Sequence, residues 1–83
     1  MTLEEAYKIV QGEASEEDVC KILEYYILLR KGQKVTVLPP KASSGDQQVY
    51  LGKLNLMFLM YSHAVDYIQL MHDKPDEVKK KYG

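Results

Sequence analysis

The chain has little cysteine and proline, no tryptophan, and no excess of one charge. Cys20 is its only cysteine, so an intramolecular disulfide is impossible, and we expect a small buried hydrophobe in a reducing cytoplasm. A formal net charge of −1 gives no indication of a nucleic-acid binder or an acidic tail. At 83 residues the chain is expected to form one domain, which is too small for the two-lobed clefts of most enzymes.

Long hydrophobic runs are also missing. In the most apolar part of the chain the longest unbroken apolar run is 56–61, and Lys53, Asp66 and other polar residues interrupt the rest. A membrane-spanning helix is therefore not predicted. The acidic start, with Glu4 and Glu5, lacks the basic and then apolar pattern of a secretion signal. We expect a cytoplasmic protein that does not contact membranes.

Residues for catalysis or metal binding do not form a convincing pattern. His63 and Asp66 have a spacing that suits two metal ligands on one helix face, but a zinc site needs three or four ligands. The acidic group at 13–18 is explained by its place at the start of a helix, where carboxylates favour the helix dipole. We expect no enzyme activity, no metal and no cofactor.

The longest helical pattern in the chain covers residues 47–72. Its apolar residues fall into two overlapping series with steps of three and four, which predict an apolar arc wide enough for two neighbours. One series is Tyr50, Leu54, Met57, Tyr61, Ala64, Ile68 and Met71, and the other is Leu51, Leu54, Phe58, Tyr61, Val65 and Ile68. The opposite stripe is polar and is expected to face water, with Leu59 as its one large apolar residue.

Two shorter helices are predicted before this long one, at 3–11 and 16–31. Thr2 and Ser15 are suitable N-caps, because their side chains can accept hydrogen bonds from backbone N–H groups of the first turn. Gly12 and Gly32 are expected to end the helices in the left-handed conformation. The second helix is apolar on most sides and should be covered on most sides.

The segments between and after the helices have their own patterns. Residues 33–40 are rich in β-branched residues and end in two prolines, which indicates an extended connector or, as the alternative, a strand that pairs with another chain. Residues 41–46 are expected to form a loop ending in a Ser44 or Asp46 cap. A last short helix is predicted at 75–81, capped by Asp73, with Tyr82 frayed.

These elements predict an all-α fold in which two shorter helices pack on one long helix, in a single domain over 1–83. A helix of about 26 residues is roughly 39 Å long and one of about 16 residues roughly 24 Å, at 1.5 Å per residue. The second helix therefore cannot cover the long one alone. We expect the remaining apolar arc to be covered by a second copy, in a two-fold antiparallel homodimer.

Seven tyrosines and no tryptophan favour half-buried positions and protein interfaces, because tyrosine combines a large apolar ring with a polar end. The sequence therefore indicates a non-enzymatic interaction module that binds itself and a larger protein. Small adaptors, inhibitors and virus-encoded regulators all fit this description. The predicted interface residues are Tyr25, Tyr26, Tyr50, Leu54, Met57, Leu59, Tyr61 and Ile68.

Nucleic-acid binding is the alternative function. Lys79, Lys80 and Lys81 are adjacent near the end of the chain and could contact phosphates. However, the helix that follows the turn at Gly12 begins with acidic residues, which would repel DNA where a recognition helix normally approaches it.

Overall fold

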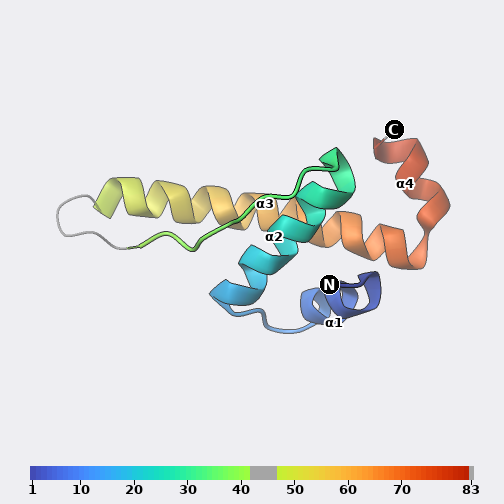
Figure 1. Ribbon diagram of the computed structural model, residues 1–83, viewed down its shortest axis with the longest axis horizontal. Coiled ribbons are helices and arrows are strands. Elements are labelled where there is room, and N and C mark those ends of the chain that lie inside the picture. Colours follow the sequence, from blue (N-terminus) through green and yellow to red (C-terminus); the bar gives the residue numbers. More distant parts are fainter. Residues whose placement is uncertain (42–46, 83) are drawn as a thin grey trace.

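The structure is a computed structural model that describes residues 1–41 and 47–82, and these ranges contain four helices (Figure 1). The helices are α1 (Leu3–Gln11), α2 (Glu16–Lys31), α3 (Gln47–Asp73) and α4 (Pro75–Tyr82). Neither range contains a strand. The predicted all-α fold, with shorter helices packed on one long helix, is therefore confirmed. The expected caps at residues 44 and 46 lie outside the described residues.

The helix ends follow from local chemistry, with one exception. Ser15 Oγ accepts a hydrogen bond of 3.2 Å from the Asp18 N–H, and the Asp18 carboxylate accepts one in return from the Ser15 N–H. At the other end of α2, Gly32 is left-handed (φ 66°), as expected. Gly12 instead has an extended backbone (φ −109°), so the left-handed end predicted for α1 is wrong. The chain leaves α1 in the extended direction that leads directly to the start of α2.

The core lies where α1 and α2 meet the middle and the C-terminal half of α3. Its fully enclosed large side chains are Ile22 of α2 and Ile68 of α3, and Cys20 is also buried there, as expected. Among the described residues, no polar or charged side chain is buried. The core is thus held by apolar packing alone, which is the main stabilising contribution in a domain of this size.

The second half of α3 carries the other helices, and its first half extends beyond them (Figure 1). α1, α2 and α4 gather around the C-terminal half, whereas only the connector, residues 32–41, runs beside the N-terminal half. Val35 and Val37 of the connector are half-buried and their neighbours Lys34, Thr36 and Leu38 are exposed. Residues 32–41 contain no strand and run beside α3 within one chain, while pairing with another chain, the alternative interpretation, stays a prediction. The molecule measures 47 × 24 × 20 Å, so it is long in the direction of α3.

Candidate interaction surface

The uncovered first half of α3, residues 47–59, is called the α3 arm below. It buries only Met57, although most of its side chains are apolar. The large apolar side chains that it leaves half exposed to water are Val49 (48%), Leu51 (52%), Leu56 (58%), Phe58 (51%) and Leu59 (57%). A soluble domain rarely leaves so many large apolar groups together in water unless another molecule covers them.

One face of the arm forms an apolar row along the helix. Leu51 and Phe58 are seven residues apart and therefore lie on the same side of α3, with the half-buried Leu54 and Tyr61 beside them. This set of four residues is called the Leu51 face. It carries no charged side chain. The spacing of three and four residues is the pattern by which one helix packs along another.

The opposite side of the arm borders a groove. This connector groove has a volume of about 420 Å³ and lies between the connector and α3. Its lining consists of Leu23, Val37, Leu38, Pro39, Pro40, Lys41, Lys53, Leu56, Met57 and Met60. Leu38 is its most exposed apolar residue, at 77%. At 100° per residue, Leu56 points roughly 140–160° away from Leu51 and Phe58, so the groove and the Leu51 face are separate surfaces.

The structure places the interface residues predicted from sequence at different depths. Tyr50, Leu54 and Tyr61 are half-buried on α3, as Tyr25 and Tyr26 are on α2. Burial raises the pKa of Tyr61 above its ordinary value, and the nearby Asp18 charge adds to the effect. Each ring is thus partly packed in its own chain and partly available.

The other three predicted interface residues differ more strongly from one another in burial. Met57 and Ile68 are buried in the core of a single chain, while Leu59 is largely exposed on the side of α3 that was expected to be polar. The other members of that side are exposed as predicted, apart from the half-buried Gln69. Of these three residues, only Leu59 offers its side chain to another molecule without a rearrangement.

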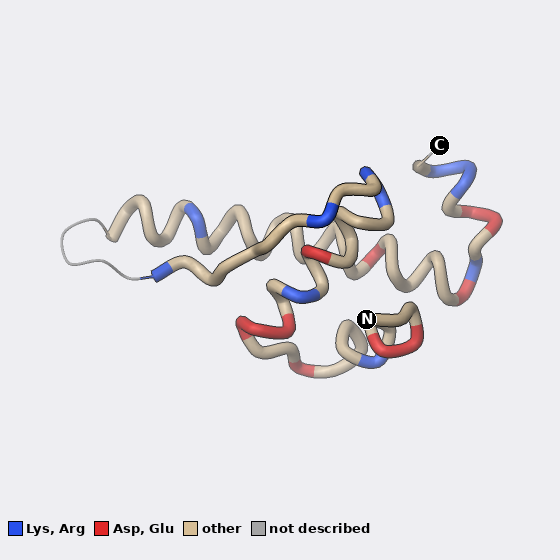
Figure 2. The backbone as a smooth tube through the Cα atoms, viewed as in Figure 1, with Lys and Arg blue, Asp and Glu red and all other residues tan. Residues whose placement is uncertain are grey.

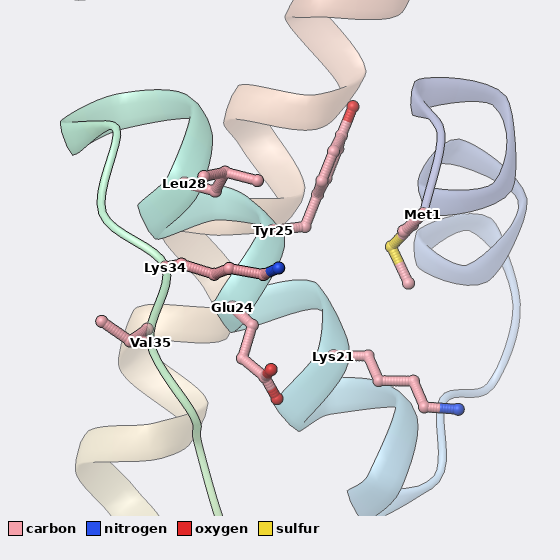
Figure 3. A pocket seen from close by; sticks show the side chains of 7 residues that line it. All are labelled: Met1, Lys21, Glu24, Tyr25, Leu28, Lys34 and Val35. Carbon is pink, nitrogen blue, oxygen red and sulfur yellow. The ribbon is translucent and has the colours of Figure 1, made fainter.

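Tyr25 borders a second cavity, of about 280 Å³, where α2 meets the N-terminus and the connector (Figure 3). Lys21, Glu24 and Lys34 surround its mouth, and Met1 and Leu28 supply apolar walls. Burial raises the pKa of Tyr25, with a smaller contribution from Tyr67. The charges at this mouth are of both signs, in contrast to the connector groove.

A cluster of rings joins α4 to the rest of the molecule. The Arg30 guanidinium lies 4.7 Å from the ring centre of Tyr82 and 5.5 Å from that of Tyr67. Tyr67 meets Tyr82 and Tyr26 edge to face, with ring centres 5.1 and 5.4 Å apart. Tyr82 is therefore packed, and the expectation that it frays is wrong. The sequence did not show that α4 turns back toward α2.

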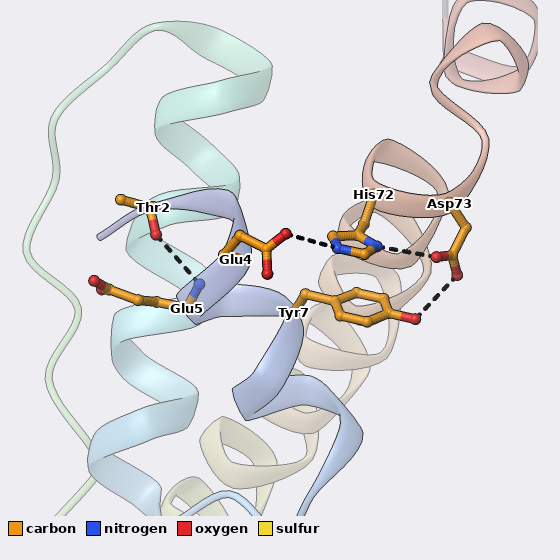
Figure 4. A network of polar contacts seen from close by, with 6 residues as sticks. All are labelled: Thr2, Glu4, Glu5, Tyr7, His72 and Asp73. Carbon is orange, nitrogen blue, oxygen red and sulfur yellow. Dashed lines mark hydrogen bonds and ion pairs between the residues drawn. The ribbon is translucent and has the colours of Figure 1, made fainter.

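A polar cluster links α1 to the end of α3 (Figure 4). The rings of Tyr7 and His72 stack with centres 3.7 Å apart, and the Tyr7 hydroxyl donates a 3.2 Å hydrogen bond to Asp73. The two ring nitrogens of His72 lie 3.0 Å from Asp73 and 3.2 Å from Glu4. Asp73, expected to cap α4, directs both carboxylate oxygens to these partners instead.

The titratable groups of this cluster shift one another's pKa values. Hydrogen bonding to Asp73 is the main cause that raises the pKa of His72, with Glu4 adding to it. The same contact holds the pKa of Asp73 below its ordinary value, and burial, followed by the contact with Asp73, raises the pKa of Tyr7. The sequence hypothesis missed this cluster, because its two halves lie 66 and 68 residues apart in the chain. Glu4 and Tyr7 one turn apart, with adjacent His72 and Asp73, were its only local signal.

The residues considered for phosphate or metal binding are spread over the surface. Lys79, Lys80 and Lys81 are exposed on α4 but are consecutive, so they point about 100° apart around the helix and form no single basic face. Asp76 and Glu77 lie one turn before them. His63 and Asp66 are exposed, and within residues 1–41 and 47–82 no group of three potential ligands could hold a metal ion.

Burial raises the pKa of the Cys20 thiol, and nearby Glu24 is the next largest cause. This cysteine is therefore a packed apolar group in the core. In the part of the chain that the structure describes, no helix is long and apolar enough to cross a membrane.

The comparisons with known proteins do not indicate a function, so a function is argued from the surface of the molecule. No protein-family model matches the chain, and no curated protein or solved structure matches it either. The fold defines a class, a small all-α domain with one projecting helix, and the uncovered arm is the feature from which a function can be argued.

Proposed function

We propose that this protein is a non-enzymatic protein-interaction module that works in the cytoplasm as a homodimer and binds or blocks a larger protein. The observation that supports this function is the α3 arm, which leaves Leu51, Leu56, Phe58 and Leu59 half exposed. Exposed apolar area of this kind, gathered on one projecting element, is typical of surfaces that bind other proteins.

Self-association is supported by the Leu51 face. Its members Leu51, Leu54, Phe58 and Tyr61 follow the spacing of three and four residues that packs two helices side by side. A two-fold axis across the arm would bring the same residues of two copies together in antiparallel order. No charged side chain lies in this row, so the contact would not bring two like charges together.

The homodimer can be tested by replacing the two most exposed members of the row. Phe58→Glu and Leu51→Glu place a charge on the face while keeping a residue that favours helix. Light scattering coupled to gel filtration at tens of micromolar should give about 19 kDa for the wild type, twice the 9.6 kDa of one chain, and the single-chain mass for both variants.

The matched control is Leu28→Glu, because Leu28 is also an exposed large apolar residue but lies on α2. This variant should keep the dimer mass, and circular dichroism should show unchanged helix content in all three variants. A wild-type mass of 9.6 kDa at the highest soluble concentration would rule out the homodimer. Equal loss of mass in Leu28→Glu would show that the Leu51 face is not the interface.

A further inference from the structure

The connector groove offers a second surface that dimer formation through the Leu51 face would leave open. From α3 it is lined by Lys53, Leu56, Met57 and Met60, and from the connector by residues 37–41. Figure 1 shows these two segments running beside each other along the arm. The groove therefore has one helical wall and one extended wall, and Leu23 of α2 also contributes to its lining.

The helical wall has the pattern that accepts another helix. Residues 53, 56, 57 and 60 stand at i, i+3, i+4 and i+7, so they form one strip along α3 that is roughly 10 Å long at 1.5 Å per residue. An amphipathic helix laid beside such a strip inserts its own apolar side chains between those of the strip. Met57 and Met60 add adaptable surface, because methionine has several rotatable bonds.

Among the residues that the structure describes, the charge of the groove lining is of one sign. Lys41 and Lys53 are the charged members of this described lining, one on each wall. Figure 2 shows Lys and Arg segments but no Asp or Glu segment along the connector and the first half of α3. Residues 32–41 and 47–59 together contain Lys34, Lys41 and Lys53 but no aspartate or glutamate. An occupant with acidic residues beside its apolar face would therefore be complementary to the groove.

We infer that the connector groove binds an acidic amphipathic helix of a different protein, with its apolar side chains against Leu56 and Met60 and its carboxylates toward Lys41 and Lys53. This inference rests on the proposed function, since it names the chemistry of the larger partner of the interaction module.

A second copy of this chain is the poorer occupant. Its exposed apolar arm carries Lys53 as the only charge, so entry into the groove would bring lysines together. Its densest acidic group, at 13–18, lies at the start of α2, where the apolar side chains Val19 and Cys20 are already buried in the core. The α3 arm is therefore apolar without acidic residues, and the start of α2 is acidic without exposed apolar side chains. The groove requires acidic and exposed apolar side chains on one helix.

The test uses two synthetic helical peptides of about 15 residues, long enough to populate a helix. Both have leucine at i, i+3, i+4 and i+7, and their flanking positions are glutamate in one and lysine in the other. Fluorescence anisotropy with the full chain should show that the acidic peptide binds at least about tenfold more tightly than the basic one, and that added salt narrows this difference.

Variants in the groove should change this preference. Lys53→Glu should weaken binding of the acidic peptide by about fivefold or more and strengthen binding of the basic one. Leu56→Glu should abolish binding of the acidic peptide, because it places a charge in the apolar strip. Lys79→Glu is the control, since it makes the same change of charge on α4 and should leave binding unchanged. Circular dichroism should show that all variants remain folded.

The outcomes separate this inference from the homodimer. Phe58→Glu should change the mass but not peptide binding, and Lys53→Glu should change peptide binding but not the mass. Equal affinity for both peptides, or no effect of Lys53→Glu, would overturn the inference. Dodecanoate, a fatty-acid anion, should be tested as a second ligand. The inference would also be overturned if dodecanoate binds, Lys53→Glu weakens its binding, and the acidic peptide does not bind. The groove would then be a site for an anionic amphiphile. A change of mass in Lys53→Glu would assign the groove to the dimer interface.

Discussion

The two halves of α3 have the same apolar content but different surroundings. Residues 47–59 and 60–73 each contain eight apolar residues, counted as Ala, Val, Ile, Leu, Met, Phe and Tyr. The second half buries Ala64, Tyr67 and Ile68, whereas the arm buries only Met57. Burial is therefore decided by which helices lie beside each half, and the apolar side chains of the arm are not explained by the packing of one chain.

The largest expected difference between the halves is in stability. Ile68→Ala removes atoms from a fully enclosed site and should lower the free energy of unfolding by about 2–5 kcal/mol. Leu51→Ala should change it by no more than about 0.5 kcal/mol, because Leu51 is half exposed. Urea unfolding of both variants in the Phe58→Glu background separates stability from self-association. Similar losses for the two variants would contradict the division of α3 into a packed half and an uncovered arm.

A smaller loss of stability is expected for substitutions in the ring cluster that attaches α4 to the second half of α3. Tyr82→Ala should lower the free energy of unfolding by about 1–2 kcal/mol, because it removes the ring that meets Tyr67 and Arg30. Tyr82→Phe keeps the ring and should retain most of this stability. Lys80→Ala on the exposed side of α4 is the control, and an equal loss in that variant would show that the ring cluster is not responsible.

A substitution that raises helix propensity in the arm should stabilise the arm without changing the stability of the core. Gly52 lies in the arm, and a Cβ added there would meet no atom within 4 Å. Gly52→Ala should therefore stabilise the helix locally by about 0.5–1 kcal/mol. Amide hydrogen exchange should become slower in residues 47–59, with unchanged exchange around Ile68. Slower exchange in both halves would show that the arm and the core open together.

The four helices could be predicted from the sequence because their signals are local. Periodic apolar residues, the cap at Ser15 and the glycine at position 32 each act within a few residues, and the structure has the corresponding ends. Gly12 shows the limit of such signals, since a glycine can also end a helix with an extended backbone. The prolines and β-branched residues of the connector likewise indicated an extended segment without showing that it runs beside α3 and forms a groove with it.

The surface was harder to predict because burial depends on how helices are placed in space. Tyr50 and Ile68 belong to the same apolar series, yet Ile68 is enclosed and Tyr50 is half-buried. Leu59 lies on the polar side of the helix and is exposed, so periodicity identified it as an exception and as an interface candidate without indicating what would cover it. The contact between Tyr7 and Asp73 joins residues 66 positions apart, and no local pattern connects them.

The smallest expected effect concerns the polar cluster that attaches α1 to the packed half, because its charges are partly exposed to solvent. The raised pKa of His72 means that its contribution to stability is complete below the ordinary value of 6.5 and is lost as the pH rises through the folded-state pKa. The lowered pKa of Asp73 means that its contribution is present above 3.8 and is lost as the pH falls through its folded-state pKa. The cluster is therefore most stabilising between these two ordinary values.

A proton NMR titration of the His72 ring should accordingly give a pKa above 6.5 in the wild type. Asp73→Asn should lower this pKa, because it removes the partner that makes the largest contribution to the shift. Glu4→Gln should also lower it, since Glu4 contacts the other ring nitrogen and its charge likewise raises the pKa of His72. His72→Gln identifies the signal. A wild-type pKa at or below 6.5, or one that Asp73→Asn leaves unchanged, would show that this cluster does not hold α1 against α3 in solution, and would leave apolar packing as the only attachment of α1.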